Sequence, residues 1–416
     1  MRPEEVRALG ELAGDAAAGV ASQARDVHTG IAGRVFGLLG PPAQAVRVVH
    51  DRVAERGYAA ACAVSGAIVR ETARAVSLSR ADDAPSLADT PAGRAVLGAL
   101  NGAWGDLLHQ RQSALETPMT LRRSGRDVAL DADSLARAFP SATGRLAVFV
   151  HGLGETDDSW RLRAARHVPY GDRMRSELGY TPLYVRYNSG LHISHNGRRL
   201  AELLQELTAN WPVEVAEIAL IGHSMGGLLA RSACHYAEPG SWREKVRDVF
   251  MLGTPHRGAP LELAANAACH AISRLPETRA FATPLKIRSA GVKDLGYGYV
   301  VDEDWHGHDP DAFRQNTSTE VPFLTSANHY FVCATISREA DAPAGRIMGD
   351  LLVLPASAWS HGGHGERMQF PVDRYSHLGG ANHLDLLNHP AIYEQIRRWI
   401  TTGRALPARA PAPTAG

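Results

Sequence analysis

Five short apolar segments constrain the fold of this chain more than any other feature. They begin at residue 145 and read RLAVFVHG, PLYVRYN, EIALIGHS, DVFMLGTPH and HYFVCATI. Segments that are apolar almost throughout and rich in Val, Ile, Tyr and Phe are typical of strands covered on both faces. Helical patterns such as GRRLAELLQELTANW lie between them, so the sequence predicts a mainly parallel sheet with helices on both faces. Ligands of such sheets bind beyond the carboxyl ends of the strands.

The N-terminal residues are predicted to form a helical module. Between residues 3 and about 113 apolar side chains recur every three or four positions, in the series Val6, Leu9, Leu12, Ala16 and Val20, the series Val46, Val49 and Val53, and the series Val64, Ile68, Ala73 and Val76. The segments LLGPP and ADDAPSLAD interrupt this pattern, and Thr90 followed by Pro91 is typical of a helix start. We expect a module of three or four helices over residues 1–117, an α/β domain over 118–403 and a disordered Pro/Ala tail over 404–416.

The composition excludes several classes of function. The 44 basic and 44 acidic side chains leave no net charge, which argues against a nucleic-acid partner. The first residues include glutamates where a secretion signal has basic residues, and no run of about 18 apolar residues occurs, so we expect a cytoplasmic protein. The four cysteines lack the spacing of a zinc site or a disulfide framework. We expect free thiols, with no metal and no cofactor.

The motif GHSMGG places Ser224 between two glycines, directly after a predicted strand and before a predicted helix. A nucleophilic serine needs this arrangement, because the strained turn lifts the hydroxyl clear of the backbone. Gly222 and Gly226 allow the strand and the helix to approach each other closely. The backbone N–H of Met225 would lie at the helix N-terminus and point at an oxygen that becomes negative beside Ser224. The sequence therefore predicts Ser224 as a nucleophile and Met225 as an oxyanion donor.

A second oxyanion donor is expected in the loop HGLGETDDSW, which follows an earlier predicted strand. A Gly-rich turn there can aim the N–H of Leu153 at the same point. His151 and Gly152 in this loop are expected to contact the substrate.

A serine hydroxyl needs a base to take its proton, and the base needs a carboxylate to orient it. His383 is the favoured base, because it stands in a Gly/Asn loop directly before an apolar helix start. His377 is the alternative, whereas His389 precedes Pro390 and is interpreted as a turn or cap residue.

The carboxylate is expected between the last apolar segment and the histidine. We favour Asp350 in GDLLVLPASA, where an apolar segment can anchor the loop. Asp341 is the alternative, in the hydrophilic segment READAPAG, and Glu339 is less favoured.

Residues 256–328 separate two predicted strands and are too many for an ordinary loop, so we expect an insertion that forms a cap or lid. LELAANAACHAISRLP within it is amphipathic, and a lid that exposes apolar surface on opening suits a lipid-like acyl substrate. A packed helix without motion is the alternative.

The segment VDEDWHGHDPD is interpreted as a solvated loop rather than a divalent-metal site. GIAGRVFGLLG, residues 30–40, has the composition to lie on a lipid surface, but packing against the rest of the protein is favoured.

Six blocks resemble, in the same order, those of bacterial lipases and esterases of the PGAP1-like group in the α/β-hydrolase superfamily. They are HGLGETDDSW, YNSGLHISHNGRRLAELL, IGHSMGGLLARSA, LGTPHRGAPLE, GDLLVLPASA and NHLDLLNHPAIYEQIRRWI. The resemblance covers residues 118 to 400 and implies an α/β-hydrolase fold. It also implies a catalytic triad and an oxyanion hole, with Ser224 as nucleophile, Asp350 as acid, His383 as base, and the amides of Leu153 and Met225 as donors.

These observations predict a serine carboxylic-ester hydrolase that forms an acyl-enzyme on an ester or lipid-like substrate. Because the same residues can act on thioesters and polyesters, an intracellular polyester depolymerase or a thioesterase is the alternative. A hydrolase-like protein that binds a partner without turnover is a further hypothesis. Peripheral contact with a lipid surface would use the N-terminal helices or the lid.

Overall fold

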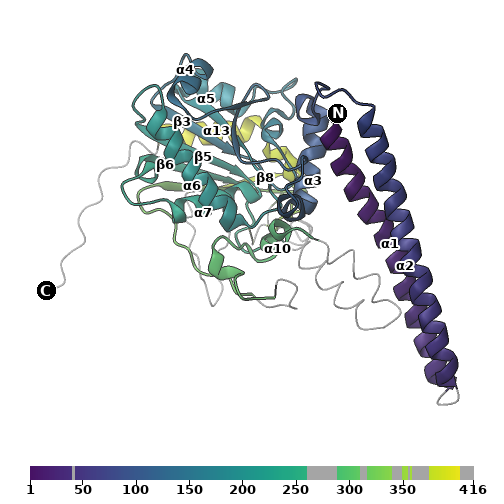
Figure 1. Cartoon of the computed structure of the whole chain (residues 1–416). Coiled ribbons are helices and arrows are strands. Elements are labelled where there is room, and N and C mark those ends of the chain that lie inside the picture. The colour runs from purple at the N-terminus through teal and green to yellow at the C-terminus, as the bar shows by residue number, and fades with distance from the viewer. Residues whose placement is uncertain are drawn as a thin grey trace.

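The computed structural model describes residues 1–39, 43–259, 288–309, 316–339, 349–354, 357 and 374–402. It shows a domain built on an eight-stranded sheet, with two long N-terminal helices that extend away from one side of it (Figure 1). The tail expected over residues 404–416 lies outside the described residues.

The sheet is mainly parallel, as the sequence predicts. Its order is β2-β1-β4-β3-β5-β6-β7-β8. The strands are β1 (Thr120–Arg123), β2 (Arg126–Val128), β3 (Arg145–Val150), β4 (Thr181–Arg186), β5 (Glu217–His223), β6 (Val246–Leu252), β7 (Asn328–Thr335) and β8 (Tyr375–Gly379). All neighbours from β4 to β8 in this order pair in parallel, whereas β1 pairs antiparallel with β2 and β4. The five apolar segments form β3 to β7, but the short, more polar β1, β2 and β8 lack such a signal.

Helices cover both faces of the sheet. One face packs against α4 (Ala132–Ala138), α6 (Ile193–Asn210) and α7 (Met225–Tyr236), and the other against α5 (Tyr170–Leu178) and α13 (Pro390–Thr402). Alternate residues of β3 enter the two cores, since Val148 packs on the first face and Phe149 on the second. Burial on both faces explains why these strands are apolar throughout.

The N-terminal region is helical, as expected, and consists of α1 (Pro3–Leu39), α2 (Gln44–Leu78) and α3 (Pro91–Gln110), with a short 3-10 helix, η2 (Leu87–Asp89). The interruption ADDAPSLAD falls between α2 and α3 and ends in η2, whereas LLGPP begins in the last turn of α1 and its other residues lie outside the described ranges. The predicted cap before α3 is confirmed, because the Thr90 hydroxyl accepts a hydrogen bond from Gly93 N at 3.0 Å and Pro91 occupies the first turn. Within the segment 30–40, Ala32 is buried and the Phe36 ring lies 5.2 Å from that of His50. These two side chains therefore pack inside the helical pair.

Helix α3 lies against the loop that follows β3. A Cβ added at Gly102 would stand 2.7 Å from Gly154 Cα, and the Arg94 guanidinium pairs with Asp158 at 2.6 Å. Figure 1 shows α3 between the sheet and the pair α1–α2. The division of the chain at residues 117 and 118 stays a prediction, but α3 is in direct contact with the α/β domain.

The expected insertion over 256–328 is described only in part, and residues 260–287, which include the amphipathic segment, lie outside the described residues. Its helix α10 (Ala290–Tyr297) is held at its start by hydrogen bonds to two backbone carbonyl groups. Ser289 Oγ donates to Gly102 O at 2.6 Å, and Gly291 N donates to Gly190 O at 3.0 Å. A moving lid therefore stays a prediction. Within the described ranges, none of the helices has the length and apolar character needed to cross a bilayer.

The turn between β5 and α7 depends on glycines that let three backbone segments meet. A Cβ at Gly226 would lie 2.2 Å from Val150 O, at the end of β3, and one at Gly222 would lie 2.4 Å from Gly227 N. Neither gap admits a methyl group. Helix α7 can therefore begin directly beside β3.

We predict that Gly226→Ala lowers the free energy of unfolding by about 1–3 kcal/mol, because the added methyl group forces the backbone of α7 away from β3. Gly57→Ala is the matched control: it lies within α2, a Cβ there meets nothing within 4 Å, and alanine favours helix by up to about 1 kcal/mol. Urea unfolding followed by near-ultraviolet circular dichroism measures both. An unchanged midpoint for Gly226→Ala would contradict the close approach.

Candidate active site

Ser224 stands at the sharp turn between β5 and α7, where its backbone has φ 54° and ψ −123°. A positive φ is strained for a residue with a side chain and persists only where the surroundings enforce it. Here Ser224 N donates to Leu252 O at 2.8 Å, and Gly227 N donates to Ser224 O at 3.1 Å. The turn leaves the Ser224 side chain partly exposed at the carboxyl edge of the sheet.

The loop after β3 brings backbone amides close to Ser224. A Cβ at Gly152 would lie 3.0 Å from Ser224 Cβ, so this loop approaches the serine without an intervening side chain. Among the described residues, the amides of Leu153 and Met225 have no hydrogen-bond acceptor. Both amides can therefore donate to a bound oxygen, although their role as oxyanion donors stays a hypothesis.

His151 holds this loop from inside the protein. Its ring is fully buried and stacks on Tyr187 with centroids 4.3 Å apart. Its Nε2 accepts from Tyr187 N at 3.3 Å, so we assign the ring proton to Nδ1, which then donates to Gly152 O at 2.9 Å. Burial lowers the pKa of His151 and favours this neutral form. The ring does not reach the surface, so the substrate contact expected of His151 is not made by its side chain.

His383 and Asp350 form a buried pair beyond the ends of β7 and β8. His383 Nδ1 lies 2.6 Å from Asp350 Oδ2, and His383 N donates to Asp350 O at 3.0 Å. The second carboxylate oxygen accepts from the backbone amides of Leu352 and Val353 at 3.0 and 2.8 Å. These bonds fix the carboxylate and, through it, the orientation of the imidazole.

The other ring nitrogen of His383 is available for chemistry. Its Nε2 is buried and has no hydrogen-bond partner among the described residues. Gly253, which follows β6 with φ 62°, lies against this ring, because a Cβ there would be 2.8 Å from His383 Cε1. A buried imidazole that is oriented at Nδ1 and unpartnered at Nε2 is suited to accept a proton.

The alternatives considered from the sequence are placed differently. His377 lies within β8, where its Nε2 is 2.7 Å from Thr335 Oγ1. His389 Nδ1 accepts from Ala391 N at 3.3 Å, in the first turn of α13, which agrees with a cap residue. Glu339 is exposed, and Asp341 lies outside the described residues.

The segment VDEDWHGHDPD forms a local turn in its described part. Asp304 is buried and accepts from Val300 N and Val301 N at 2.7 and 3.1 Å, while Asp302 pairs with Arg198 at 2.6 Å. Across the described residues, no three His, Cys, Asp or Glu side chains gather as ligands for a metal ion. The carboxylates of this segment therefore serve backbone and ion-pair contacts.

Sequence reasoning did not single out a second buried pair, Glu155 and His223. His223 Nδ1 lies 2.9 Å from Glu155 Oε1, and its Nε2 lies 3.2 Å from His383 O. The contact of Nδ1 has the distance of an ion pair but not the geometry of a hydrogen bond. Because both nitrogens lie close to oxygen acceptors, the doubly protonated imidazolium suits them best. The other oxygen of Glu155 accepts from Gly152 N at 2.9 Å. The pair thus joins the loop after β3 to the backbone of His383.

The charges of this pair stabilise each other. Burial alone would raise the pKa of Glu155, but the charge of His223 lowers it to about 2. Burial alone would lower the pKa of His223, but the Glu155 carboxylate outweighs this and raises it. The only local hints in the sequence are the glutamate three residues after Gly152 and the histidine before Ser224.

Comparison with known families places this site in context. Residues 141–321 match the family described as the PGAP1-like alpha/beta domain. The matched segment contains Ser224 and the loop after β3 but ends before Asp350 and His383. No curated protein matches the chain.

Several solved structures are similar at low identity. The mature form of the lipase BlEst2 from Bacillus licheniformis is 16% identical, over 61% of this chain and 91% of that one, with a TM-score of 0.39. The carboxylesterase CesB from Bacillus subtilis is 10% identical, over 62% and 84%, with a TM-score of 0.32. The phospholipase PlaB from Legionella pneumophila is 15% identical, over 52% and 46%, with a TM-score of 0.30. Because each TM-score is below 0.5, we infer nothing about activity from these structures.

The Glu155–His223 pair predicts a specific dependence of stability on pH. A carboxylate with a lowered pKa stabilises the fold above its ordinary value of 4.5 and loses this effect as the pH falls towards about 2. A histidine with a raised pKa stabilises the fold below its ordinary value of 6.5 and loses this effect as the pH rises through the raised pKa. The difference in free energy of unfolding between wild type and Glu155→Gln should therefore be greatest between these ordinary values. Urea unfolding across this pH range measures it, and a difference that does not vary with pH would contradict the ion pair.

Proposed function

We propose that this chain is a serine carboxylic-ester hydrolase of the PGAP1-like group in the α/β-hydrolase superfamily, in agreement with the family match over residues 141–321. The observation that supports this best is the buried His383–Asp350 pair, whose Nε2 is unpartnered. It lies at the carboxyl edge of the sheet, the same edge as the strained turn that presents Ser224. A nucleophile, an oriented base and free backbone amides at one edge are the groups that acyl transfer requires.

In the proposed reaction Ser224 Oγ attacks the carbonyl carbon of an ester while His383 Nε2 takes the hydroxyl proton. Asp350 holds the imidazole and stabilises the positive charge that forms on it. The carbonyl oxygen becomes negative and receives hydrogen bonds from the amides of Leu153 and Met225. When the intermediate collapses, His383 gives its proton to the leaving alcohol and an acyl-Ser224 remains. Water then attacks this ester with the same proton transfers, and the acid is released.

The residues of the proposed site do not select esters over thioesters or polyesters, so a thioesterase or an intracellular polyester depolymerase is the alternative activity. Hydrolysis of matched oxygen and thiol esters with several acyl lengths separates these substrate classes. A cytoplasmic location stays a prediction.

Fluorophosphonate labelling tests the nucleophile directly. We expect the wild type to be labelled at Ser224, whereas the variants Ser224→Ala and His383→Ala are not labelled, because the first lacks the attacking oxygen and the second lacks the base.

In a kinetic assay, Asp350→Asn should lower kcat for a short-chain ester by about 10⁴-fold, since the imidazole is then held in the wrong tautomer. His389→Ala is the control and should keep its labelling. Absence of labelling in a folded wild type would favour a hydrolase-like protein that binds without turnover.

We also propose that Glu155 and His223 are positioning residues for this reaction. The point that a Cβ would occupy on Gly152 is 3.0 Å from Ser224 Cβ and 3.1 Å from Glu155 Oε1, so this carboxylate lies next to the nucleophile. An unpaired negative charge there would oppose the developing oxyanion. His223 neutralises it and at the same time holds the backbone of His383.

This role predicts a non-additive pair of variants. His223→Ala should lower kcat for a neutral short-chain ester by about 10²-fold with little change in KM at a pH high enough to keep Glu155 ionised, because its carboxylate is then left unpaired beside the oxyanion. Adding Glu155→Gln should restore kcat at least about tenfold, since it removes that charge. If the double variant is slower than either single variant, the pair acts only through structure.

A further inference from the structure

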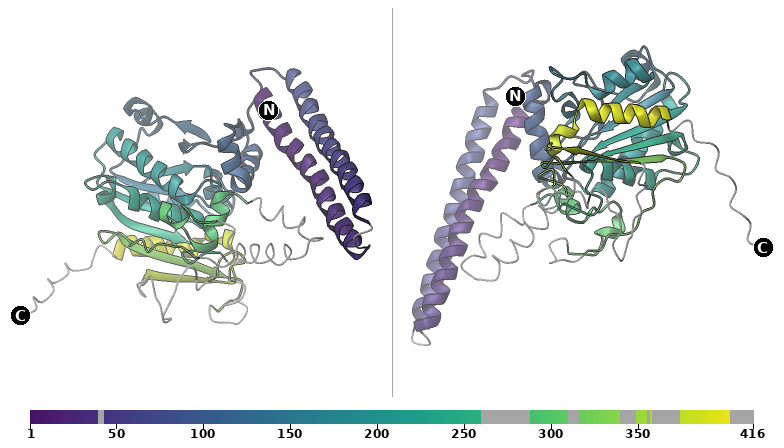
Figure 2. Two further views of the ribbon diagram at one scale, coloured as in Figure 1. Left: turned by 60° about the horizontal axis from the view of Figure 1, so that its bottom comes forward. Right: turned by 180° about the vertical axis from the view of Figure 1, so that it is seen from behind.

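Helices α1 and α2 form a hairpin, and its contacts with the other described residues lie towards its base. There, Ala8, Leu9 and Leu12 pack in a cluster with Leu97 and Leu108 of α3. The buried Glu5 carboxylate accepts from Leu87 N at 3.0 Å, and Asp15 pairs with Arg111 at 2.6 Å. Beyond this base the hairpin projects away from the domain in all three views (Figures 1 and 2).

The side of α2 that faces away from α1 carries an exposed apolar stripe, which we call the outer stripe. It consists of Val46, Val49, Val53, Gly57, Ala60, Val64, Ile68, Glu71, Ala75 and Leu78. Its large members are well exposed, with 62% for Val46 and Val49, 67% for Val53 and 61% for Ile68. Glu71 is its only charged member. The sequence predicts five of its members, namely Val46, Val49, Val53, Val64 and Ile68, but not that α1 leaves them uncovered.

The spacing of the outer stripe keeps it straight. Its members recur every 11 residues, as Val46, Gly57 and Ile68 do, and as Val53, Val64 and Ala75 do. Eleven residues correspond to three turns of about 3.67 residues, close to the 3.6 of an α-helix, whereas the seam of a left-handed coiled coil repeats every 3.5 residues. The stripe therefore runs along one side of α2 for roughly 48 Å.

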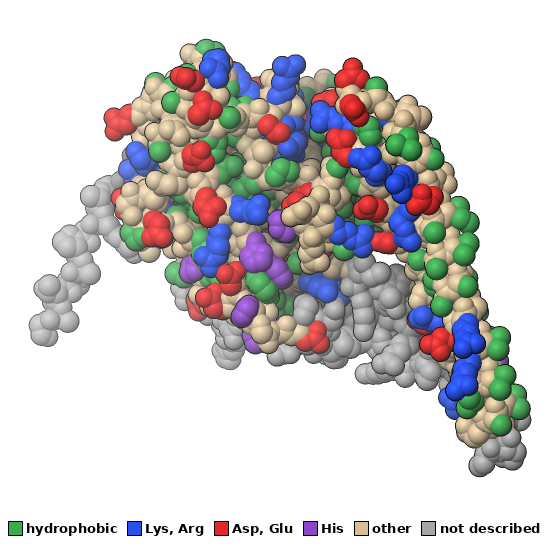
Figure 3. Space-filling view, viewed as in Figure 1, with side chains coloured by type: hydrophobic (Ala, Val, Ile, Leu, Met, Phe, Trp, Pro, Cys, Tyr) green, Lys and Arg blue, Asp and Glu red, His purple; other side chains and the backbone are tan. Residues whose placement is uncertain are grey.

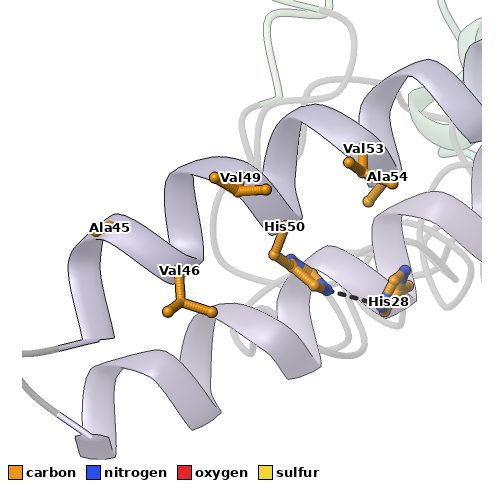
Figure 4. A pocket seen from close by; sticks show the side chains of 7 residues that line it. All are labelled: His28, Ala45, Val46, Val49, His50, Val53 and Ala54. Atoms are coloured by element: carbon orange, nitrogen blue, oxygen red, sulfur yellow. Dashed lines mark hydrogen bonds between the residues drawn. The ribbon is translucent and has the colours of Figure 1, made fainter.

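A shallow groove adjoins the far end of the stripe. It is lined by His28, Ala45, Val46, Val49, His50, Val53 and Ala54. Figure 4 shows Val46, Val49 and Val53 along α2, beside the contact between His50 and His28 that joins α2 to α1 at 3.3 Å. Apolar atoms thus dominate the exposed surface at this end of the hairpin.

Positive charge borders the stripe on one flank. Arg52 and Arg56 are exposed, and within the described part of the chain neither has a carboxylate partner. Arg70 and Arg74 lie on the same flank, because residues 18 apart on an α-helix point in the same direction, but they pair with Asp15 at 3.3 Å and Glu71 at 3.9 Å. Figure 3 shows basic side chains beside apolar ones towards the far end of the hairpin. A straight apolar stripe with arginines along one flank is the pattern of a helix that lies in the headgroup region of an anionic membrane.

We propose that the outer stripe of α2 docks the protein on the surface of an anionic phospholipid bilayer. The valines enter the headgroup region, and Arg52 and Arg56 contact lipid phosphates. The choice of a lipid surface over a second copy of the chain follows from Arg52 and Arg56, which are exposed beside the stripe and have no carboxylate partner among the described residues. It also agrees with the lipid-like substrate of the proposed function, on which the docking itself does not depend.

Flotation of the full chain with lipid vesicles tests the proposal. Neutral vesicles of phosphatidylcholine are compared with anionic vesicles that contain equal parts of phosphatidylcholine and phosphatidylglycerol. We expect flotation with the anionic vesicles only, and less of it as salt rises. Arg52→Gln with Arg56→Gln should weaken partitioning by about fivefold per arginine. Val49→Glu should weaken it at least about tenfold, because a charge replaces a buried valine.

Ile31→Glu is the matched control, since Ile31 is an apolar residue of α1 with 50% exposure that is not part of the outer stripe. It should float as the wild type does. A wild type that does not float, or equal loss of flotation in both glutamate variants, overturns the proposal. So does light scattering that shows a dimer which Val49→Glu converts to a monomer, because a second copy then covers the stripe.

The docking and the proposed function fail separately. Ser224→Ala should float like the wild type, and Val49→Glu should hydrolyse a soluble short-chain ester at the wild-type rate. Flotation without hydrolysis would support the docking surface and contradict the proposed hydrolase activity. Hydrolysis without flotation would support the activity and contradict the docking surface.

Discussion

The contact between the start of α7 and the end of β3 is the constraint on which the candidate site depends. A Cβ at Gly226 would lie 2.2 Å from Val150 O, so the two backbones meet without a side chain between them. This contact sets the distance between Ser224, which precedes α7, and the loop that follows β3. The strain at Ser224 is maintained because Leu252 O and Gly227 N hold its backbone on both sides.

Parallel strands bring together residues that are far apart in the sequence. Ser224 follows β5, Gly253 follows β6, and Asp350 and His383 follow β7 and β8. Since the carboxyl ends of parallel strands lie along one edge, each of these short loops contributes to the same small region. The polar contacts then fix the details. Asp350 binds two amides of its own turn as well as His383, so the orientation of the imidazole depends on a rigid segment of backbone.

The local pattern of the sequence predicted some of these features better than others. Strands β3 to β7 were predictable because burial on both faces demands apolar residues throughout, whereas β8 carries Ser376 and His377 and reads as a loop. The chain order of serine, acid and histidine indicated Asp350 as the carboxylate that orients His383, and the two side chains lie 2.6 Å apart. Glu155 and His223 gave no comparable signal, because their pairing joins segments whose proximity only the folded sheet creates. Periodicity predicted the apolar stripe of α2, but it cannot show whether a neighbour covers that stripe.

Helix α3 gives the hairpin a mechanical connection to the proposed chemistry. One end of the connection is the apolar cluster that α3 shares with α1, and the other is the contact of Gly102 with Gly154, one residue after Leu153. The same helix therefore supports both the base of the hairpin and the loop beside Ser224, so a substitution that displaces α3 would disturb both.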